Sequence, residues 1–479
     1  MNYNQHSMLT YQDLQALGDS DEKRMEFTRQ AIAKHMSSGI YATAEIADDY
    51  IHQRNRTITE YQKILYKVTG EAVPDTVSAN YKLCSNYFYR FVTAQNQFSL
   101  GNGVEWGNRK AAENKLGDDF DMRLQELGHA ALVGGVSFGF FNLDHVEVFT
   151  LQEFAPIYDE ENGALMAGVR FWQVEPSRPI RATLYEIDGF TDYIWDKKNT
   201  KGTILHDKTP YKITLRQSEA DGLKIYDGGN YPGFPIIPLW GSPLKQSEIV
   251  GIREQIDCYD LIKSGFANDL DDASQIYWIL QNTGGMDDID LTKFVERMKT
   301  VKAAVVDGDD GVKAESHTVE VPYQSRQAML DNLKKDLYRD FMALDTESIA
   351  SGAVTATQIE AAYEPINNKA DQYEHCILDF LRELMKIAGI EGENPSFTRS
   401  YIVNRTEEIQ ALVTAGTYLP DDYVTERVLT ILGDGDKADE MIKQMEADDY
   451  ERLNFQPNNQ PPQEGAEKGG DDYVGERQT

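Results

Sequence analysis

Apolar residues recur at helical spacing in two long stretches of the second half of the chain. In residues 246–270 and again in residues 323–344, apolar side chains return mostly three or four positions apart. This periodicity predicts two helices that pack against other elements along their whole length. Their apolar positions include Ile249, Ile252, Ile256, Tyr259, Phe266, Leu330, Leu333 and Leu337.

A loop follows the second helix at residues 345–354 and leads into a third long helix. The loop has small side chains that cannot form a core of their own, and it includes Thr346, Glu347, Ser348, Ile349, Ala350, Ser351 and Gly352. Thr355, followed three residues later by Gln358, is typical of a capping box and predicts the start of the third helix. Pro365 lies within the helical pattern, so a kink is expected there.

The N-terminal half combines helical and strand patterns. Residues 21–54, 80–97 and 118–133 are predicted to be helical, and the second of these is strongly aromatic. From residue 134 onward, glycine, aromatic and aliphatic residues alternate as in strands, and the Asn-Gly turn at 159–163 predicts a hairpin. Further strands are expected at residues 154–158, 167–174, 182–187, 191–195 and 211–215. We therefore expect a mostly antiparallel sheet beside the N-terminal helices.

The segment between the first two long helices, residues 271–322, has a mixed pattern. It predicts strands at residues 275–280, 303–306 and 317–321 and a helix at 291–298. Three short helices are expected late in the chain, at 406–416, 422–432 and 436–452. From residue 454 the chain is rich in Pro, Gln, Asn, Gly and Glu, which predicts a disordered tail. The fold class is α+β, mainly helical with an antiparallel sheet region and a small α/β module.

The chain is strongly acidic, which limits the kinds of partner it can bind. Its 479 residues carry 79 Asp and Glu against 47 Lys and Arg, a formal charge of −32. Tight, sequence-independent DNA binding depends on Lys and Arg displacing counterions from phosphates, so this balance argues against it. A surface past which DNA slides without sticking remains compatible with the charge.

Cysteine usage and hydropathy indicate a cytoplasmic protein. Cys84, Cys258 and Cys376 are far apart in sequence and form no Cys-x-x-Cys pair, which is typical of buried thiols in a reducing compartment. The N-terminus lacks the basic start and apolar segment of a signal peptide, and no run has the apolar length of a membrane span. We expect no membrane association.

One motif raises the possibility of an enzyme. Residues 135–139 match the Gly-x-Ser-x-Gly nucleophile elbow around Ser137, and Asp144 and His145 follow closely. The elbow requires a sharp turn from strand to helix, whereas Phe140 and the residues after it continue a strand into a turn. Glycines that let aromatic side chains pack across a sheet explain the pattern better. A serine hydrolase is kept as the alternative, and no enzymatic activity is expected.

No motif predicts a cofactor or a metal. The glycines at 101–103 fit a turn better than a dinucleotide fingerprint, and no phosphate-binding loop occurs. The acidic clusters lack the spacing of a calcium loop, and the histidines form no His-x-x-x-His pair.

Three basic residues on the second long helix allow two interpretations. Lys334, Lys335 and Arg339 have Asp331, Asp336 and Asp340 nearby at helical spacing, which favours salt bridges on a solvated face. The alternative is that they face a DNA-filled channel as isolated positive points in an acidic wall.

The order of these segments resembles that of the portal proteins of long-tailed bacteriophages, the head-to-tail connectors typified by Bacillus phage portals. The resemblance rests on five motifs in the order of that family rather than on any single one. They are Asn80–Leu83 through Phe98–Gly103, Gly134–Phe138, Pro156–Asp159 leading to Gly168–Phe171, Phe234–Pro238 followed by Ser247–Asp260, and Leu419–Val424 through Met445–Glu446.

The resemblance implies a portal-type fold with named regions. Residues 1–245 would form the outer wing, 246–270 and 323–344 the two stem helices, and 271–322 the clip between them. Residues 345–354 would be the tunnel loop that touches DNA, 355–403 the kinked wing helix and its connection, 404–453 the crown, and 454–479 the tail. In this loop the acids Asp345 and Glu347 occur without a base, a departure that argues against direct gripping of DNA.

The resemblance also implies an assembly and its partners. The chain would form a ring, commonly of twelve subunits, at one capsid vertex, with the apolar stem positions as contacts between subunits. Double-stranded DNA would pass through it without sequence specificity, and the terminase large subunit, head-completion and tail adaptor proteins, and the major capsid and scaffold proteins would be partners. Clip contacts would involve Gln281, Asn282, Asp287 and Asp288. The expected location is the portal vertex of the virion, after assembly in the host cytoplasm; another capsid-associated ring or scaffold is a further alternative.

Overall fold

The chain divides into two compact units, residues 1–400 and 401–479, and each is described by itself. The structure is a computed structural model. It describes residues 8–66, 70–76, 78–196, 202–218, 222–273, 277–281, 313–317, 322–347, 356–399, 405–433, 438 and 441–445.

The largest core of the first unit lies between a three-stranded antiparallel sheet and the helices around it. Its elements are α3 (Gly39–Ile51), α5 (Tyr87–Leu100), α7 (Phe120–Gly134), β4 (Val136–Asn142), β5 (His145–Thr150), β13 (Ile236–Trp240) and α12 (Ala356–Ala388). The strand order is β13–β4–β5, and Phe138 in the central strand pairs with Pro238 on one side and Phe149 on the other. Phe138 and Phe149 are fully buried, as is Leu127 of α7. Aromatic side chains on β4 and β5 therefore hold the sheet to the helices.

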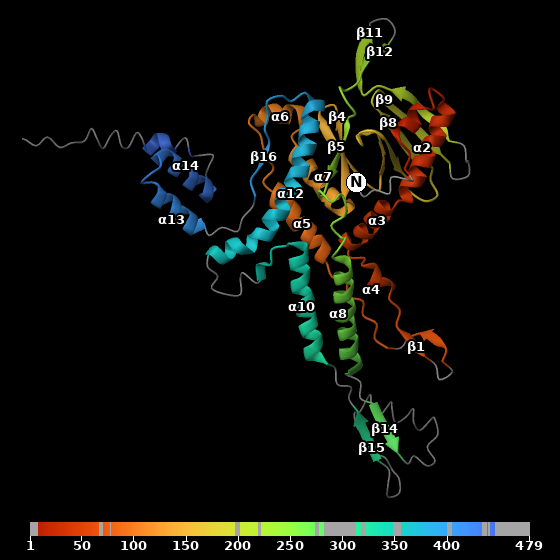
Figure 1. The fold of residues 1–479 in the computed structure, drawn as a ribbon, viewed down its shortest axis with the longest axis vertical. Coiled ribbons are helices and arrows are strands. Elements are labelled where there is room, and N and C mark those ends of the chain that lie inside the picture. Colours follow the sequence, from red (N-terminus) through yellow and green to blue (C-terminus); the bar gives the residue numbers. More distant parts are fainter. Residues whose placement is uncertain are drawn as a thin grey trace, which may run out of the picture. The chain divides into compact units, whose positions relative to one another are not determined.

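A second core lies on a five-stranded antiparallel sheet (Figure 1). Its elements are α1 (Tyr11–Gln15), α2 (Asp21–Met36), β6 (Phe154–Tyr158), β7 (Leu165–Trp172), β8 (Ile180–Glu186), β9 (Gly189–Trp195) and β10 (Thr203–Thr209), in the order β10–β9–β8–β7–β6. Phe27 and Ala31 of α2 pack on it together with Leu184 and Tyr193. The prediction of an antiparallel sheet beside N-terminal helices is confirmed.

The glycines of the Gly-x-Ser-x-Gly motif have packing roles. A Cβ atom on Gly139 would lie 2.7 Å from the ring of Phe380, so the absence of a side chain lets α12 lie against β4. Gly135 ends α7 in the left-handed conformation, with a φ of 86°. The interpretation that these glycines admit aromatic packing is confirmed for Gly139.

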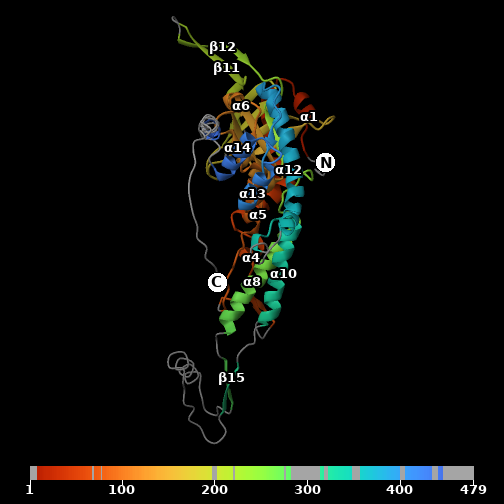
Figure 2. The ribbon, with the colours of Figure 1, turned by 90° about the vertical axis from the view of Figure 1, so that its left-hand side faces the viewer.

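A pair of helices, α8 (Arg253–Ala273) and α10 (Tyr323–Phe341), lies side by side in both views (Figures 1 and 2). The sequence predicted that the first helix begins at residue 246, but it begins seven residues later. Gly251 has a φ of 95°, which is incompatible with a helix running through it. The second helix ends close to its predicted end because Met342 adopts the left-handed conformation.

The long helix α12 contains Pro365 and bends along its length (Figure 1). Proline removes a backbone donor and clashes with the preceding turn, so a bend is the expected consequence. Thr355, the predicted cap, lies outside the described residues.

Several boundaries differ from the prediction. Residues 21–54 are not one helix, because the chain breaks at Ser37 and Ser38, and the Ser38 side chain accepts a hydrogen bond from the Tyr41 backbone N–H (3.3 Å) as the cap of α3. The strand expected at 317–321 is found earlier as β15 (Lys313–His317), paired with β14 (Tyr277–Gln281). The predicted elements at 291–298 and 303–306 lie outside the described residues.

Short elements complete the first unit, and most of them were not predicted. They are α4 (Arg56–Glu60), β1 (Ile64–Tyr66), β2 (Ala72–Pro74), β3 (Val104–Glu105), α6 (Arg109–Leu116), β11 (Lys212–Ser218), β12 (Gly222–Gly229) and β16 (Ser396–Phe397). The pairs β1–β2, β11–β12 and β3–β16 each form a two-stranded antiparallel sheet.

The second unit contains α13 (Arg405–Ala415) and α14 (Asp421–Leu432), close to their predicted bounds. Residues 441–445 are also helical, within the third predicted helix. Among the apolar residues described in this unit, Ala438 alone is buried, so these helices have little core of their own. The predicted tail at 454–479 lies outside the described residues.

His35 is buried in the second core, and its protonation makes the free energy of unfolding depend on pH in mild acid. One ring nitrogen, Nε2, lies 2.7 Å from the carbonyl oxygen of Leu151, and the side chain packs against the rings of Tyr41 and Phe171. Burial lowers its pKa to about 4, because the charged imidazolium is poorly solvated there.

We expect His35→Gln to flatten the loss of stability in mild acid. Since the folded pKa lies below the ordinary value, the unfolded chain binds this proton first as the pH falls. The contribution of His35 is intact above about pH 6.5 and decreases by about 3 kcal/mol by about pH 4. Urea unfolding across this range measures it, with His375→Gln, at an exposed position of α12, as the matched control. An equal slope in wild type and His35→Gln would contradict the assignment.

Candidate functional site

The two long helices pair along an antiparallel seam with a polar contact at each end. At one end Gln255 Nε2 donates to Asp340 Oδ2 (2.6 Å), and at the other Arg326 forms an ion pair with Asp269. Leu330, Leu333 and Leu337 of α10 are buried between these contacts. The seam is therefore apolar at its centre and closed by polar pairs.

Several residues predicted as contacts between subunits lie in the chain's own core. Ile249, Ile252, Ile256 and Leu337 are at most 3% exposed and belong to the largest core, whereas Tyr259 packs at its edge. Phe266 is partly buried beside Tyr323, with ring centroids 6.4 Å apart. The helical spacing of the four buried residues is thus explained within one chain, because these side chains pack in the core that α8, α10 and the N-terminal region share.

A ladder of polar side chains on α8 holds the segment that precedes α5. Asp260, Ser264 and Asn268 accept hydrogen bonds from the backbone N–H groups of Ser85 (2.9 Å), Leu83 (2.9 Å) and Tyr81 (2.6 Å). Four residues along a helix and two along an extended chain both advance about 6 Å, so the two sets of groups stay in register. We call residues 81–85 the strap.

Asp260 is the most buried member of this ladder. It has no exposed surface, and it also accepts a hydrogen bond from Asn55 Nδ2 (2.5 Å). Burial raises the pKa of its carboxyl group, because the charged form loses solvation, while the hydrogen bonds from Asn55 and Ser85 oppose that shift. One turn earlier, Asp257 accepts hydrogen bonds from the hydroxyl groups of Tyr50 and Thr57. The polar side of α8 is therefore satisfied by the N-terminal region.

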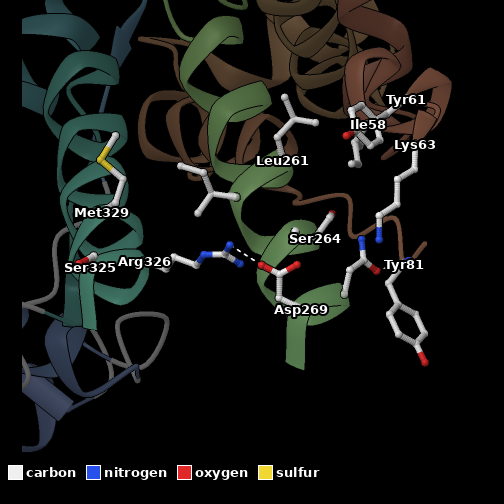
Figure 3. Close-up of a pocket in the computed structure, with 13 residues that line it drawn as sticks. Ile58, Tyr61, Lys63, Tyr81, Leu261, Ser264, Asp269, Ser325, Arg326 and Met329 are labelled. Atoms are coloured by element: carbon white, nitrogen blue, oxygen red, sulfur yellow. Dashed lines mark hydrogen bonds and ion pairs between the residues drawn. The ribbon is translucent and has the colours of Figure 1, made fainter. Parts of the chain in front are cut away.

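A hollow of about 560 Å³ lies next to the strap (Figure 3). Leu261, Ile262 and Gly265 of α8 line the hollow, and we call this part of α8 its floor. Met329 of α10 lies on one flank and Tyr61 on the other (Figure 3). The Arg326–Asp269 ion pair lies at its edge (Figure 3). The lining is thus mostly uncharged.

The basic residues of α10 are mostly paired with acids. Lys334 forms an ion pair with Glu347 at the start of the loop, and Arg339 pairs with Asp336 (2.9 Å) and Asp340 (3.3 Å). Lys335 is exposed, and the structure shows no ion pair for it among the described residues. The favoured interpretation, salt bridges to Asp331, Asp336 or Asp340, thus holds for Arg339, whereas Lys334 pairs with Glu347 instead. Thr346 and Glu347 continue as a helical turn, and the loop from Ser348 to Gly352 lies outside the described residues.

A buried lysine joins α12 to the end of α10 and to the segment that precedes α8. Lys369 Nζ lies 2.7 Å from a carboxylate oxygen of Glu248 and donates to the carbonyl oxygen of Phe341 (2.9 Å), whose ring lies 3.2 Å from the same nitrogen. Burial lowers the pKa of Lys369, and Glu248 opposes that shift. The segment before α8, the end of α10 and the middle of α12 therefore meet at one charged contact.

Of the predicted clip contacts, the structure describes Gln281 alone. It ends β14 opposite Lys313 of β15, whereas Asn282, Asp287 and Asp288 lie outside the described residues.

The hydroxyl group of Ser137 is not placed for catalysis. Ser137 is fully buried in β4 and donates to the carbonyl oxygen of Leu127 (2.7 Å). Asp144 and His145 pair with each other on an exposed turn (2.9 Å). A nucleophile must be reachable by substrate, so this arrangement does not support a serine hydrolase.

Within the described residues, no three or more His, Cys, Asp or Glu side chains gather as metal ligands would. No helix among them has the length and apolar character needed to cross a membrane. The three cysteines are free and partly buried.

Comparison with known proteins identifies the family of the chain. The family described as phage portal protein, SPP1 Gp6-like, matches residues 43–453. This chain belongs to the phage portal protein family. The match spans the sheet region, the α8–α10 pair, α12 and the helices of the second unit.

Two relatives are portal proteins. The portal protein of Bacillus phage SPP1 is 24% identical over 387 residues, which cover 75% of each chain. The portal protein of Clostridium phage phiCD119 is 28% identical over 233 residues, which are 47% of this chain and 49% of that protein. In this second comparison the chain therefore spans about half the length of its relative. Among solved structures, a chain from the virion of a native gene transfer agent particle is similar at 10% identity with a TM-score of 0.39, covering 72% of this chain and 89% of that one.

Membership in the portal family confirms the resemblance to phage portal proteins that the sequence motifs indicate. It also confirms the prediction that the chain is not an enzyme, because the family is structural. The polar ladder was missed by sequence reasoning. Its signal is the spacing of Asp260, Ser264 and Asn268 on one helix face, but short polar residues at helical spacing are common on solvated faces. Only the structure shows that backbone N–H groups cover them.

We expect Asp260→Ala to lower the free energy of unfolding by roughly 2–4 kcal/mol, because the Ser85 N–H and the Asn55 amide lose a charged acceptor in a buried place. Chemical unfolding of the purified protein measures this value. Glu254→Ala, at an exposed position of the same helix, is the matched control and should change stability by less than about 0.5 kcal/mol. Equal effects of the two substitutions would contradict the role of the ladder.

Proposed function

We propose that this protein forms a ring at one vertex of a phage capsid, through which double-stranded DNA is packaged and later ejected. The observation that carries the proposal is the portal family match over residues 43–453. The ring, of about twelve copies by the resemblance, would dock the terminase large subunit during packaging and head-completion or tail adaptor proteins afterwards. It would also contact the major capsid and scaffold proteins, and its location would be the portal vertex of the virion.

The regions of the proposed ring follow the order of the elements. The wing is residues 1–245, with residues 355–403 across it, and the stem is the α8–α10 pair within 246–270 and 323–344. The clip is 271–322, the tunnel loop 345–354, the crown 404–453 and the tail 454–479. The support is that, in chain order, α8 is followed by the antiparallel strand pair β14 and β15 and then by α10, which runs antiparallel to α8. A strand pair that lies in the chain between the end of one stem helix and the start of the other suits the docking role proposed for the clip, with Gln281, Asn282, Asp287 and Asp288 as contacts.

Charge supports a bore that does not hold DNA. The chain carries −32, and the Lys334 ammonium group is already paired with Glu347 at the start of the proposed tunnel loop. Phosphates would meet few unpaired cations on this wall, with Lys335 as a candidate, so DNA would slide rather than bind.

Purified protein is expected to form closed rings with a central hole. Negative-stain images viewed down the axis would show the hole, and native mass spectrometry would give the number of subunits. A well-behaved monomer at micromolar concentration would contradict the proposal.

Deleting Ser348–Gly352 is expected to leave rings intact and to reduce DNA packaging or retention, because the loop is proposed to meet DNA in the bore. Packaging of DNA into capsids measures the effect. Replacing the same residues with glycine and serine at equal length is the control that separates loop length from side-chain identity. Unchanged packaging by the deletion variant would remove the proposed role of the loop.

A further inference from the structure

Gly265 lies in the interior of α8, and the residues that the structure describes give no reason for a glycine there. A glycine in a helix interior costs about 1 kcal/mol relative to alanine. At several other glycines of this chain a Cβ atom would collide with neighbouring atoms, as at Gly128 and Gly139. At Gly265 it would meet no atom of the described part of the chain within 4 Å. Close approach by something outside the chain would account for a glycine at this position.

Gly265 forms part of the floor of the hollow described above. The hollow runs across α8 between Met329 of α10 and Tyr61, and these two flanking side chains are 42% and 45% exposed (Figure 3). Its ion pair, Arg326–Asp269, is internally neutral. Lys63 is the other charged residue of the lining. A mostly uncharged concave surface flanked by the exposed side chains of Met329 and Tyr61 fits an apolar partner, and glycine in its floor lets a helix come close.

The same helix pair carries exposed apolar residues away from the hollow. Leu270 and Tyr323 are 53% and 58% exposed and do not line the hollow, although Asp269 and Ser325 beside them in sequence do. In a closed ring of identical chains each interface joins one surface of a subunit to a different surface of the next. A hollow on one side of α8–α10 and apolar side chains on another side meet this requirement. Copies that each carry −32 would also repel one another at charged surfaces, which favours an uncharged contact.

We propose that the hollow over Gly265 is the socket for the α8–α10 pair of a second copy of this chain, which enters through the side that carries Leu270 and Tyr323. The proposal rests on the ring of the proposed function and names the surfaces that close it. Gly265 is the point of closest approach between the two copies.

The first test enlarges the side chain at the floor of the socket. Gly265→Met should leave the monomer folded with an unchanged or higher melting temperature, because its Cβ has space and methionine favours helix. Ring formation, followed by native mass spectrometry, should fall at least tenfold. Gly39→Met is the matched control, since Gly39 lies in α3 and is also clear of its own chain's atoms, and it should form rings normally. Normal rings from Gly265→Met would overturn the proposal.

The second test links the two surfaces directly. Cysteines replace Tyr61 and Tyr323 in a chain whose own three cysteines are changed to serine, and a short bismaleimide is added. The proposal predicts a ladder of covalent oligomers up to the full ring, whereas each single-cysteine variant gives no ladder. Covalent species that stop at a dimer would indicate a symmetric contact and overturn the proposal. Rings without any cross-link would overturn the socket and leave the proposed function standing, and wild-type protein without rings would overturn both.

Discussion

Two helices side by side have no interior of their own, and this constraint governs how α8 and α10 are built into the rest of the chain. Their shared seam buries Leu333 and Leu337, but each helix keeps other faces that need partners. One face of α8 obtains its partner from the N-terminal region, through the ladder that holds the strap. The remaining faces carry the hollow and the exposed apolar residues. One side of the helix pair is thus covered by other parts of the chain, and other sides stay exposed, as a subunit of an assembly requires.

Charged residues are arranged differently where elements of the chain meet and on the surface. At the joints, charges are largely removed from solvent and paired: Lys369 with Glu248, and the partly buried Arg399 with Glu374 (2.8 Å) on α12. Leaving one member of such a pair uncompensated is costly, so these contacts fix α12 to the segment before α8 and to the residues just after β16. At the surface, acids exceed bases, which keeps the chain soluble and weakens attraction to phosphate. The proposed passage of DNA without binding would need both properties.

Periodicity in the sequence located the long elements well, and in the first unit this is because their apolar positions face a continuous core. The helix pair, α12, α13, α14 and strands β6 to β9 were all predicted near their observed positions. Boundaries set by a single backbone conformation were missed: Gly251 delays the start of α8, and Ser38 divides the helix expected at 21–54. The short strand β10 was missed because Leu205, His206, Asp207 and Lys208 break any alternation of apolar and polar residues.

The candidate site was harder to predict than the fold. Helical spacing marks a buried stripe but does not distinguish burial inside one chain from burial between two. For that reason Ile249, Ile252 and Ile256 were assigned to contacts between subunits, whereas the structure places them in the core. The socket could not be predicted because it depends on empty space above Gly265, and the ladder could not be predicted because its donors are backbone groups far away in sequence.

Hydrogen exchange of the α8 amides, compared between dilute monomer and assembled ring, is the most direct test of whether neighbouring copies of the chain cover the exposed sides of the helix pair. On assembly, protection should rise strongly at residues 261–269, whereas residues 81–85, already held by the ladder within one chain, should change little. Equal protection of residues 261–269 in both states would show that the helix pair is complete on its own and would contradict the account.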